Sequence, residues 1–139
     1  MIIIIQEVLF MNKDLILEFV DRINAQDADG VASFMAIDHV FVDAHDHVHE
    51  GKQMMRDAWS EYFKIFPDYK IEVEDVLEQE NRLAIFGHAS ATYKGTAAGP
   101  SNFWRLPAAW KAVISEGKIK LWQLYCDYKI IYDIIQKNQ

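Results

Sequence analysis

Alternating apolar and polar residues fill most of the second half of the chain, and this pattern restricts the folds open to it. Four such runs can be read from the sequence: 69–77, 83–93, 103–115 and 118–127. A period of two is typical of strands that bury one face. Pro107 interrupts the third run, so we expect a bulge or a sheet edge there. Tight turns are predicted at Glu116-Gly117 and within residues 95–101.

Three segments with helical spacing lie before these runs. The first covers residues 13–25, and its apolar side chains recur at helical intervals: Leu15, Ile16, Phe19, Val20 and Ile23. Residues 24–30, NAQDADG, predict a stop and a restart. The short second helix is expected to carry Val31, Phe34 and Met35. The third begins at Gly51 and ends before Pro67, and residues 39–43 alternate as a strand between the last two helices. This order predicts an α+β fold with the helices on the concave face of the sheet.

Size and charge limit the possible functions. A length of 139 residues fits one domain with one core. The net charge of −7 is not balanced by a basic block, so nucleic-acid binding is not expected. Cys126 is the single cysteine, which excludes an internal disulfide and a multi-cysteine zinc site. These features favour a soluble, cytoplasmic protein.

The first ten residues are treated separately. Their apolar run, Ile2 to Ile5, is far shorter than the roughly 20 residues that cross a bilayer, so no membrane segment is expected. The segment has no basic region and no small-residue cleavage site, so a secretory signal is not expected. Met11 is an alternative start. We therefore predict one domain over residues 11–139, with residues 1–10 as an N-terminal extension of uncertain status.

Two motifs carry a resemblance to a known family. They are the NAQDADG turn at residues 24–30 and the ending GKIKLWQLYCD at residues 117–127. Together with the segments between them, they make the chain resemble the SnoaL-like branch of the NTF2-like superfamily from Met11 onward. The resemblance implies a cone, in which a strongly curved antiparallel or mixed sheet wraps around three N-terminal helices. It also implies a small-molecule pocket and a homodimer.

The resemblance implies two candidate catalytic carboxylates. Asp43 falls at a strand end where isomerase relatives carry a general base, and the apolar pocket is expected to raise its pKa. Asp127 ends the motif WQLYCD, where cyclases and limonene epoxide hydrolase use an aspartate for acid/base chemistry. The alternatives are that Asp43 begins a turn and that Asp127 caps the following helix. Strand parity places Trp122 and Tyr125 on opposite faces, with Asp127 on the face of Tyr125.

Six aromatic residues are predicted to bind the ligand: Phe19, Trp59, Phe63, Trp104, Trp122 and Tyr125. Mostly apolar walls with a few polar groups are typical of small-molecule sites. The alternative is ordinary core packing. The oxyanion donors of ketosteroid isomerase fall on Phe19 and near Ala109 here, and one such donor is worth roughly 3 to 4 kcal/mol of transition-state stabilisation. Isomerisation by that mechanism is therefore not expected.

His45, His47 and His49 alternate beside Asp43, which raises the possibility of a zinc or iron site. The resembled family turns the chain within this segment, so we predict a polar turn and no metal. The leading hypothesis is a cofactor-independent acid/base enzyme that acts on a small hydrophobic or polyketide-like carbonyl compound. Cyclisation, isomerisation, dehydration and epoxide opening all belong to this class. The alternative is a non-catalytic ligand-binding or dimerisation module.

Overall fold

The computed structural model describes residues 11–95 and 102–139, so the predicted extension at 1–10 and most of the turn at 95–101 lie outside the described residues. Four helices are present in this part of the chain: α2 (Asn12–Asn24), α3 (Ala28–Ser33), α4 (Lys52–Ile65) and α5 (Lys129–Lys137). Six strands accompany them: β1 (Met35–Val42), β2 (Val48–Glu50), β3 (Lys70–Gln79), β4 (Arg82–Thr92), β5 (Phe103–Ser115) and β6 (Lys118–Tyr125). None of the described helices is long and apolar enough to span a membrane.

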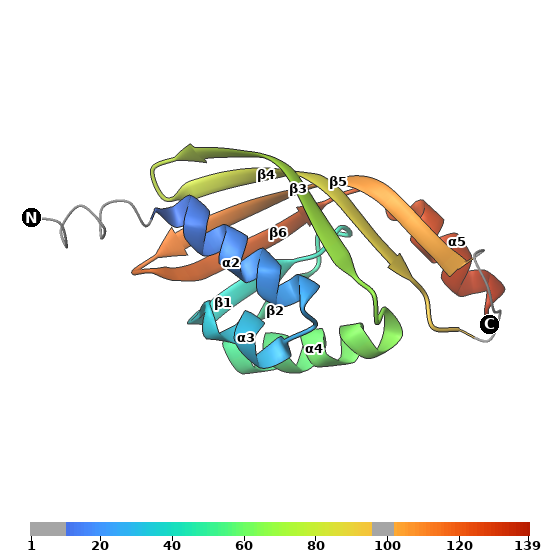
Figure 1. Ribbon diagram of the computed structural model, residues 1–139. Helices are drawn as coiled ribbons and strands as arrows, with labels where there is room; N and C mark the ends of the chain where they lie inside the picture. Colours follow the sequence, from blue (N-terminus) through green and yellow to red (C-terminus); the bar gives the residue numbers. More distant parts are fainter. Residues whose placement is uncertain (1–10, 96–101) are drawn as a thin grey trace, which may run out of the picture.

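The strands form one curved sheet in the order β2-β1-β6-β5-β4-β3 (Figure 1). All neighbours are antiparallel except β1 and β6, which run parallel and pair Phe41 with Trp122. The sheet bends around α2, α3 and α4, while α5 lies at the end of the sheet where β6 ends. The predicted α+β cone with a mixed sheet is confirmed.

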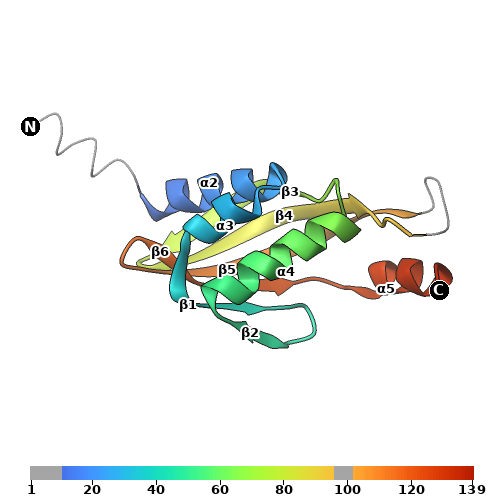
Figure 2. The same ribbon diagram turned by 90° about the horizontal axis from the view of Figure 1, so that it is seen from below.

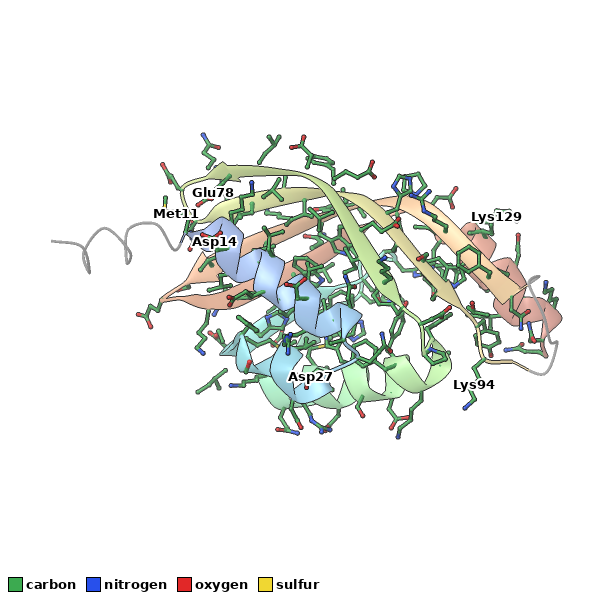
Figure 3. All side chains as sticks on the ribbon, in the orientation of Figure 1. Met11, Asp14, Asp27, Glu78, Lys94 and Lys129 are labelled. Atoms are coloured by element: carbon green, nitrogen blue, oxygen red, sulfur yellow. The ribbon has the colours of Figure 1, made fainter. Side chains whose placement is uncertain are left out.

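Helix α2 lies against β3 and is fixed at both ends. At its start the Asp14 carboxylate accepts a hydrogen bond from the Met11 amide at 2.8 Å, and Figure 3 shows both residues near the end of the β3–β4 hairpin. At its end Asn24 pairs with the backbone of Ile71 in both directions, at 2.9 Å to the carbonyl and 2.8 Å from the amide. The apolar face of α2 is therefore held on the concave side of the sheet, where its predicted stripe is buried.

Helix α4 crosses the same side of the sheet, with the β1–β2 hairpin beside it (Figure 2). It ends at Ile65, and the next residue, Phe66, leaves the helical conformation before Pro67 as predicted. Three apolar side chains of α4 are buried against the sheet: Met55, Trp59 and Phe63. Their spacing of four residues places them on one face of the helix.

The structure corrects the predicted end of the second helix and shows how Pro107 fits into strand β5. Met35 begins β1 and does not belong to the second helix, which ends at Ser33. Strand β5 runs through Pro107 without interruption and pairs it with His88 of β4. On its other side β6 pairs only from Ala109 onward, so Pro107 occupies a locally free edge of β5, as predicted.

Candidate functional site

A cavity of about 280 Å³ opens between α4 and the concave face of the sheet. Its lining is mostly aromatic: Phe41, Asp43, Ala44, His45, His49, Met55, Ala58, Trp59, Tyr62, Tyr69, Trp110, Trp122, Leu124 and Tyr128. This volume is at the small end of the range of ligand pockets, which suits a molecule of a few rings. Lysine and arginine are absent from the lining.

Periodicity places these side chains on one surface. Met55, Trp59 and Tyr62 are spaced by four and three residues, so they share a face of α4. On the sheet, Trp110 lies opposite Leu124, and Leu124 follows Trp122 by two residues on the same face of β6. The helix and the sheet thus form two walls, and Trp122 and Tyr125 lie on opposite faces of the sheet as predicted.

A hydrogen-bonded pair, Asp43 and His49, lies at the edge of the cavity. The register of the β1–β2 hairpin sets His49 opposite Phe41, and their rings stack with centroids 5.8 Å apart. Asp43 follows Phe41 by two residues, so its side chain reaches the same face. The Asp43 Oδ2 atom lies 2.9 Å from His49 Nε2, which donates to the carboxylate. His49 Nδ1 has no hydrogen-bond partner among the described residues.

The turn after β1 fixes the Asp43 carboxylate. Its Oδ1 atom accepts hydrogen bonds from the backbone amides of His45 at 2.9 Å and of His47 at 3.0 Å. Partial burial opposes ionisation, but the hydrogen bonds from His49 and these amides outweigh it, so the pKa of Asp43 lies below its ordinary value. The expected rise in this pKa is wrong. Asp43 remains ionised, so the carboxylate is the acceptor of the pair and His49 Nε2 is the donor.

Three tyrosines supply most of the other polar atoms of the lining. Burial raises the pKa of Tyr69, Tyr62 and Tyr128, so each phenol remains protonated. The rings of Tyr62 and Tyr69 pack edge-on with centroids 5.0 Å apart. Tyr128 packs edge-on against His45, with ring centroids 5.0 Å apart. The cavity therefore combines one carboxylate–imidazole pair with a group of neutral hydroxyls.

The predicted site residues separate into two groups. Asp43, Trp59 and Trp122 line the cavity. The others do not: Phe19, Phe63, Trp104, Tyr125 and Asp127.

Three of these aromatic side chains lie behind the cavity wall. Phe19 packs edge-on against Trp122 with ring centroids 5.1 Å apart, and Phe63 packs on Trp59 at 5.4 Å. Trp104 lies 6.2 Å from Tyr69 and is 2% exposed. These contacts are core packing, which was the alternative to ligand binding for the three residues.

The other two residues of this group lie outside the concave side. Tyr125 is 51% exposed and lines a shallow hollow on the outer face of the sheet, beside Phe86 and His88. Asp127 is exposed, and its Oδ1 atom accepts a hydrogen bond from the Lys129 amide at 3.0 Å, at the start of α5. This contact holds the first amide of α5, which is close to the capping alternative, but the N-cap position itself is occupied by Tyr128.

Sequence reasoning missed His49 as a partner of Asp43 and missed the three tyrosines. The alternation of His45, His47 and His49 was a signal, but it was interpreted as a possible metal site. The chain turns at residues 43–47, so the three imidazoles are not on one face of one strand. In the described ranges, residues 11–95 and 102–139, no group of three or more His, Cys, Asp or Glu side chains is arranged to hold a metal ion.

The curved mixed sheet and its helices, enclosing an aromatic cavity, define an NTF2-like domain. The sequence profile of the SnoaL-like domain matches residues 16–122, and the chain belongs to this family. No protein with a curated functional description matches the chain.

Solved structures agree on the fold. A candidate SnoaL-like polyketide cyclase from Jannaschia sp. CCS1 has a TM-score of 0.77 and 15% identity, covering 89% of this chain and 90% of that one. AclR, a proposed hydroxylase from Streptomyces galilaeus, has a TM-score of 0.72 and 23% identity, covering 90% and 95%. A protein of ketosteroid isomerase-like fold from Catenulispora acidiphila, solved with trimethylamine, has a TM-score of 0.71 and 12% identity, covering 80% and 83%. At these identities the likeness establishes the fold alone.

Proposed function

We propose that the protein is a cofactor-independent acid/base enzyme that moves a proton on a small hydrophobic carbonyl compound. The observation that carries the proposal is the 2.9 Å hydrogen bond between Asp43 and His49 at the wall of an aromatic cavity. A general base needs a lone pair that is free to accept a proton, and His49 Nδ1 has no hydrogen-bond partner among the described residues. One structure of the same fold is described as a SnoaL-like polyketide cyclase, and this description motivates the choice of a polyketide-like substrate class.

In this mechanism His49 is the base and Asp43 orients it. His49 donates its Nε2 proton to Asp43, which leaves the lone pair of Nδ1 to accept a proton from a carbon next to the substrate carbonyl. Asp43 then stabilises the imidazolium that forms, because its lowered pKa keeps it ionised. Trp59 and Trp122 offer apolar surface to the rings of the substrate.

The second candidate function is non-catalytic binding of the same class of ligand. The two backbone amides that Asp43 binds favour it, because they give the carboxylate a structural role in its own turn. On this alternative the cavity binds ligand, but no proton leaves the bound molecule.

Exchange of ligand protons with deuterated water separates the two candidates. We would incubate the protein with 2-tetralone in D₂O and follow loss of the α-proton signal by NMR. The enzyme hypothesis predicts faster exchange than in buffer, and the His49→Gln and Asp43→Asn variants should lose at least about 100-fold of the enhancement, the scale expected of a general base. The matched control for Asp43→Asn is Asp75→Asn, because Asp75 is exposed on β3 and lies outside the cavity lining. Binding without enhanced exchange in the wild type would support the non-catalytic module.

We also propose that two copies pair through the outer face of the sheet. Phe86 is 43% exposed and Tyr125 51% exposed, and both line the hollow on that face. Exposed apolar patches of this kind mark interaction surfaces. Light scattering should give the mass of two chains for the wild type and of one chain for Phe86→Glu. A wild-type mass of one chain would contradict the dimer.

A further inference from the structure

The formal charges around the cavity are not balanced. Among the described residues of the lining, Asp43 is the only acid, and neither lysine nor arginine accompanies it. Its side-chain partners in the described part of the chain are imidazoles, those of His47 at 3.6 Å and His49 at 2.9 Å. The pKa of Asp43 lies below its ordinary value, so the carboxylate is ionised at neutral pH. While the imidazoles are neutral, this edge of the cavity therefore carries a net negative charge.

Aromatic rings form a row along the sheet wall, beginning next to this carboxylate. Phe41 precedes Asp43 by two residues on the same face of the chain, and it lies opposite Trp122 in the register of β1 and β6. Trp122 in turn stacks on Trp110 of β5, with ring centroids 6.0 Å apart and an angle of 18° between the rings. The three rings thus come from three neighbouring strands, and all of them line the cavity.

The helix wall of the cavity is aromatic as well. Trp59 and Tyr62 of α4 line it, and their rings pack edge-on with centroids 5.8 Å apart. Burial raises the pKa of Tyr62, so its phenol remains neutral. A neutral aromatic ring has a negative face, which attracts a cation that comes within about 6 Å of the ring centroid. The cavity therefore combines an ionised carboxylate at its edge with aromatic rings on both walls.

This combination favours a positively charged ligand over a neutral ligand of the same shape. The neutral ligand gains only from burial against the apolar walls, whereas a cation also gains from the carboxylate and from the ring quadrupoles. An alkylated ammonium group fits better than a primary one, because a primary ammonium is strongly hydrated and loses its water at a high cost. The net charge of −7 on the whole chain adds a long-range attraction for cations.

We propose that the cavity binds compact tertiary or quaternary alkylammonium cations, with the charged nitrogen beside Asp43 and the alkyl groups against the rings of Phe41 and Trp59. Such binding goes beyond the proposed function, because it requires neither a carbonyl group nor a proton transfer. The cavity volume of about 280 Å³ limits the ligand to a small molecule. A bound cation would occupy the same space as the ketone and would compete with it.

Two molecules of the same shape test the preference for positive charge. Choline and 3,3-dimethylbutan-1-ol differ in the atom that joins their methyl groups, which is a charged nitrogen in choline and a neutral carbon in the alcohol. An NMR titration of the wild-type protein, followed through the tryptophan indole signals, should show at least about tenfold tighter binding of choline. Equal affinities for the two molecules, including no binding of either, would overturn the proposal.

Asp43→Asn separates the charge of the carboxylate from the shape of the cavity. Asparagine keeps an acceptor oxygen for the amides of His45 and His47 but has no charge. The variant should bind choline about as weakly as the alcohol and bind the alcohol as the wild type does, and undiminished choline binding would contradict the site. Asp75→Asn is the matched control, because it removes one exposed carboxylate of β3 outside the lining and should leave both affinities unchanged.

Phe41→Leu tests the contribution of the rings while Asp43 is kept. Leucine retains an apolar side chain but has no aromatic face, so choline should lose about threefold more affinity than the alcohol. An equal loss for both molecules would overturn the role of the ring in binding the cation. Choline preference without exchange of ketone α-protons would refute the enzyme alone, and exchange without choline preference would refute the cation site alone.

Discussion

The His39 imidazole donates a hydrogen bond from Nδ1 to the Ile119 carbonyl at 2.7 Å and thereby ties β1 to β6. His39 is 1% exposed, in the first strand, and the two residues are 80 positions apart in the chain. Burial disfavours the imidazolium and outweighs the effect of the Ile119 hydrogen bond, so the pKa of His39 lies below its ordinary value of 6.5.

This pKa predicts a loss of stability in mild acid. As the pH falls, the unfolded chain binds a proton at His39 before the folded chain does, so the free energy of unfolding falls as the pH drops below about 6.5. The contribution has a slope of at most about 1.4 kcal/mol per pH unit. Denaturant titrations from pH 7.5 to 5 should show a smaller slope for His39→Asn than for the wild type. The largely exposed control His47→Asn should keep the wild-type slope.

The Asn24 side chain makes two hydrogen bonds to the backbone of Ile71, so replacing it is predicted to destabilise the protein. Asn24→Ala removes both hydrogen bonds to Ile71 and leaves a partly buried backbone group without a partner. We expect the free energy of unfolding to fall by about 1–3 kcal/mol, measured by urea denaturation. Asn12→Ala is the control, because Asn12 makes one long contact of 3.5 Å, to the Glu80 carbonyl, and should cost much less. Equal losses in the two variants would contradict this role of Asn24.

Gly87 allows β3 and β4 to approach closely where β3 bulges. A Cβ atom at Gly87 would lie 1.8 Å from the Glu72 carbonyl oxygen, next to the register shift between Val73 and Asp75. Gly87→Ala should therefore destabilise the fold by at least about 1–3 kcal/mol through backbone displacement. Gly117→Ala has open space but a φ of +73°, so its cost should be nearer 1 kcal/mol. Thermal unfolding of both variants tests this order.

Substitutions at Asp127 distinguish its capping role from its predicted catalytic role. If it caps the start of α5, Asp127→Ala should lower the free energy of unfolding by about 1 kcal/mol, while ketone binding and α-proton exchange remain near wild type. The catalytic role stays a prediction, and it would be supported by loss of exchange at unchanged stability. Asp127→Asn is the milder comparison, because asparagine retains an acceptor oxygen and also caps well.

The fold was predictable because periodicity reports which face of an element is buried. The strand runs 83–93 and 103–115 and the stop before Pro67 all agree with the structure to within a residue or two. Met35 was misplaced, since an apolar residue directly after a short helix fits the end of the helix as well as the start of a strand.

The site was only partly predictable, because core packing and cavity lining draw on the same apolar residues. Nothing in the sequence distinguishes Trp59 from Trp104 as a candidate cavity residue, yet only Trp59 lines the cavity. The difference arises from the position of α4 over the sheet. The Asp43–His49 pair depends on the register of a short hairpin, and a shift of one residue would turn His49 to the other face. Tyr69 begins the alternating run 69–77, but that period identifies a buried face and not a cavity wall. Tyr128 lies in a connecting segment where no periodicity applies.

The parallel pairing of β1 with β6 sets the order in which the molecule can assemble. Met35 aligns with Ile119 and Phe41 with Trp122, so the sheet closes only after partner residues at least 81 positions further along the chain are available. Contacts so distant in sequence form late, because the intervening loop must first be ordered. The hairpin that holds Asp43 and His49 is attached to the sheet through this pairing alone. A nascent chain would therefore carry a folded β3–β4 hairpin well before it has a site, and binding would appear in one late step.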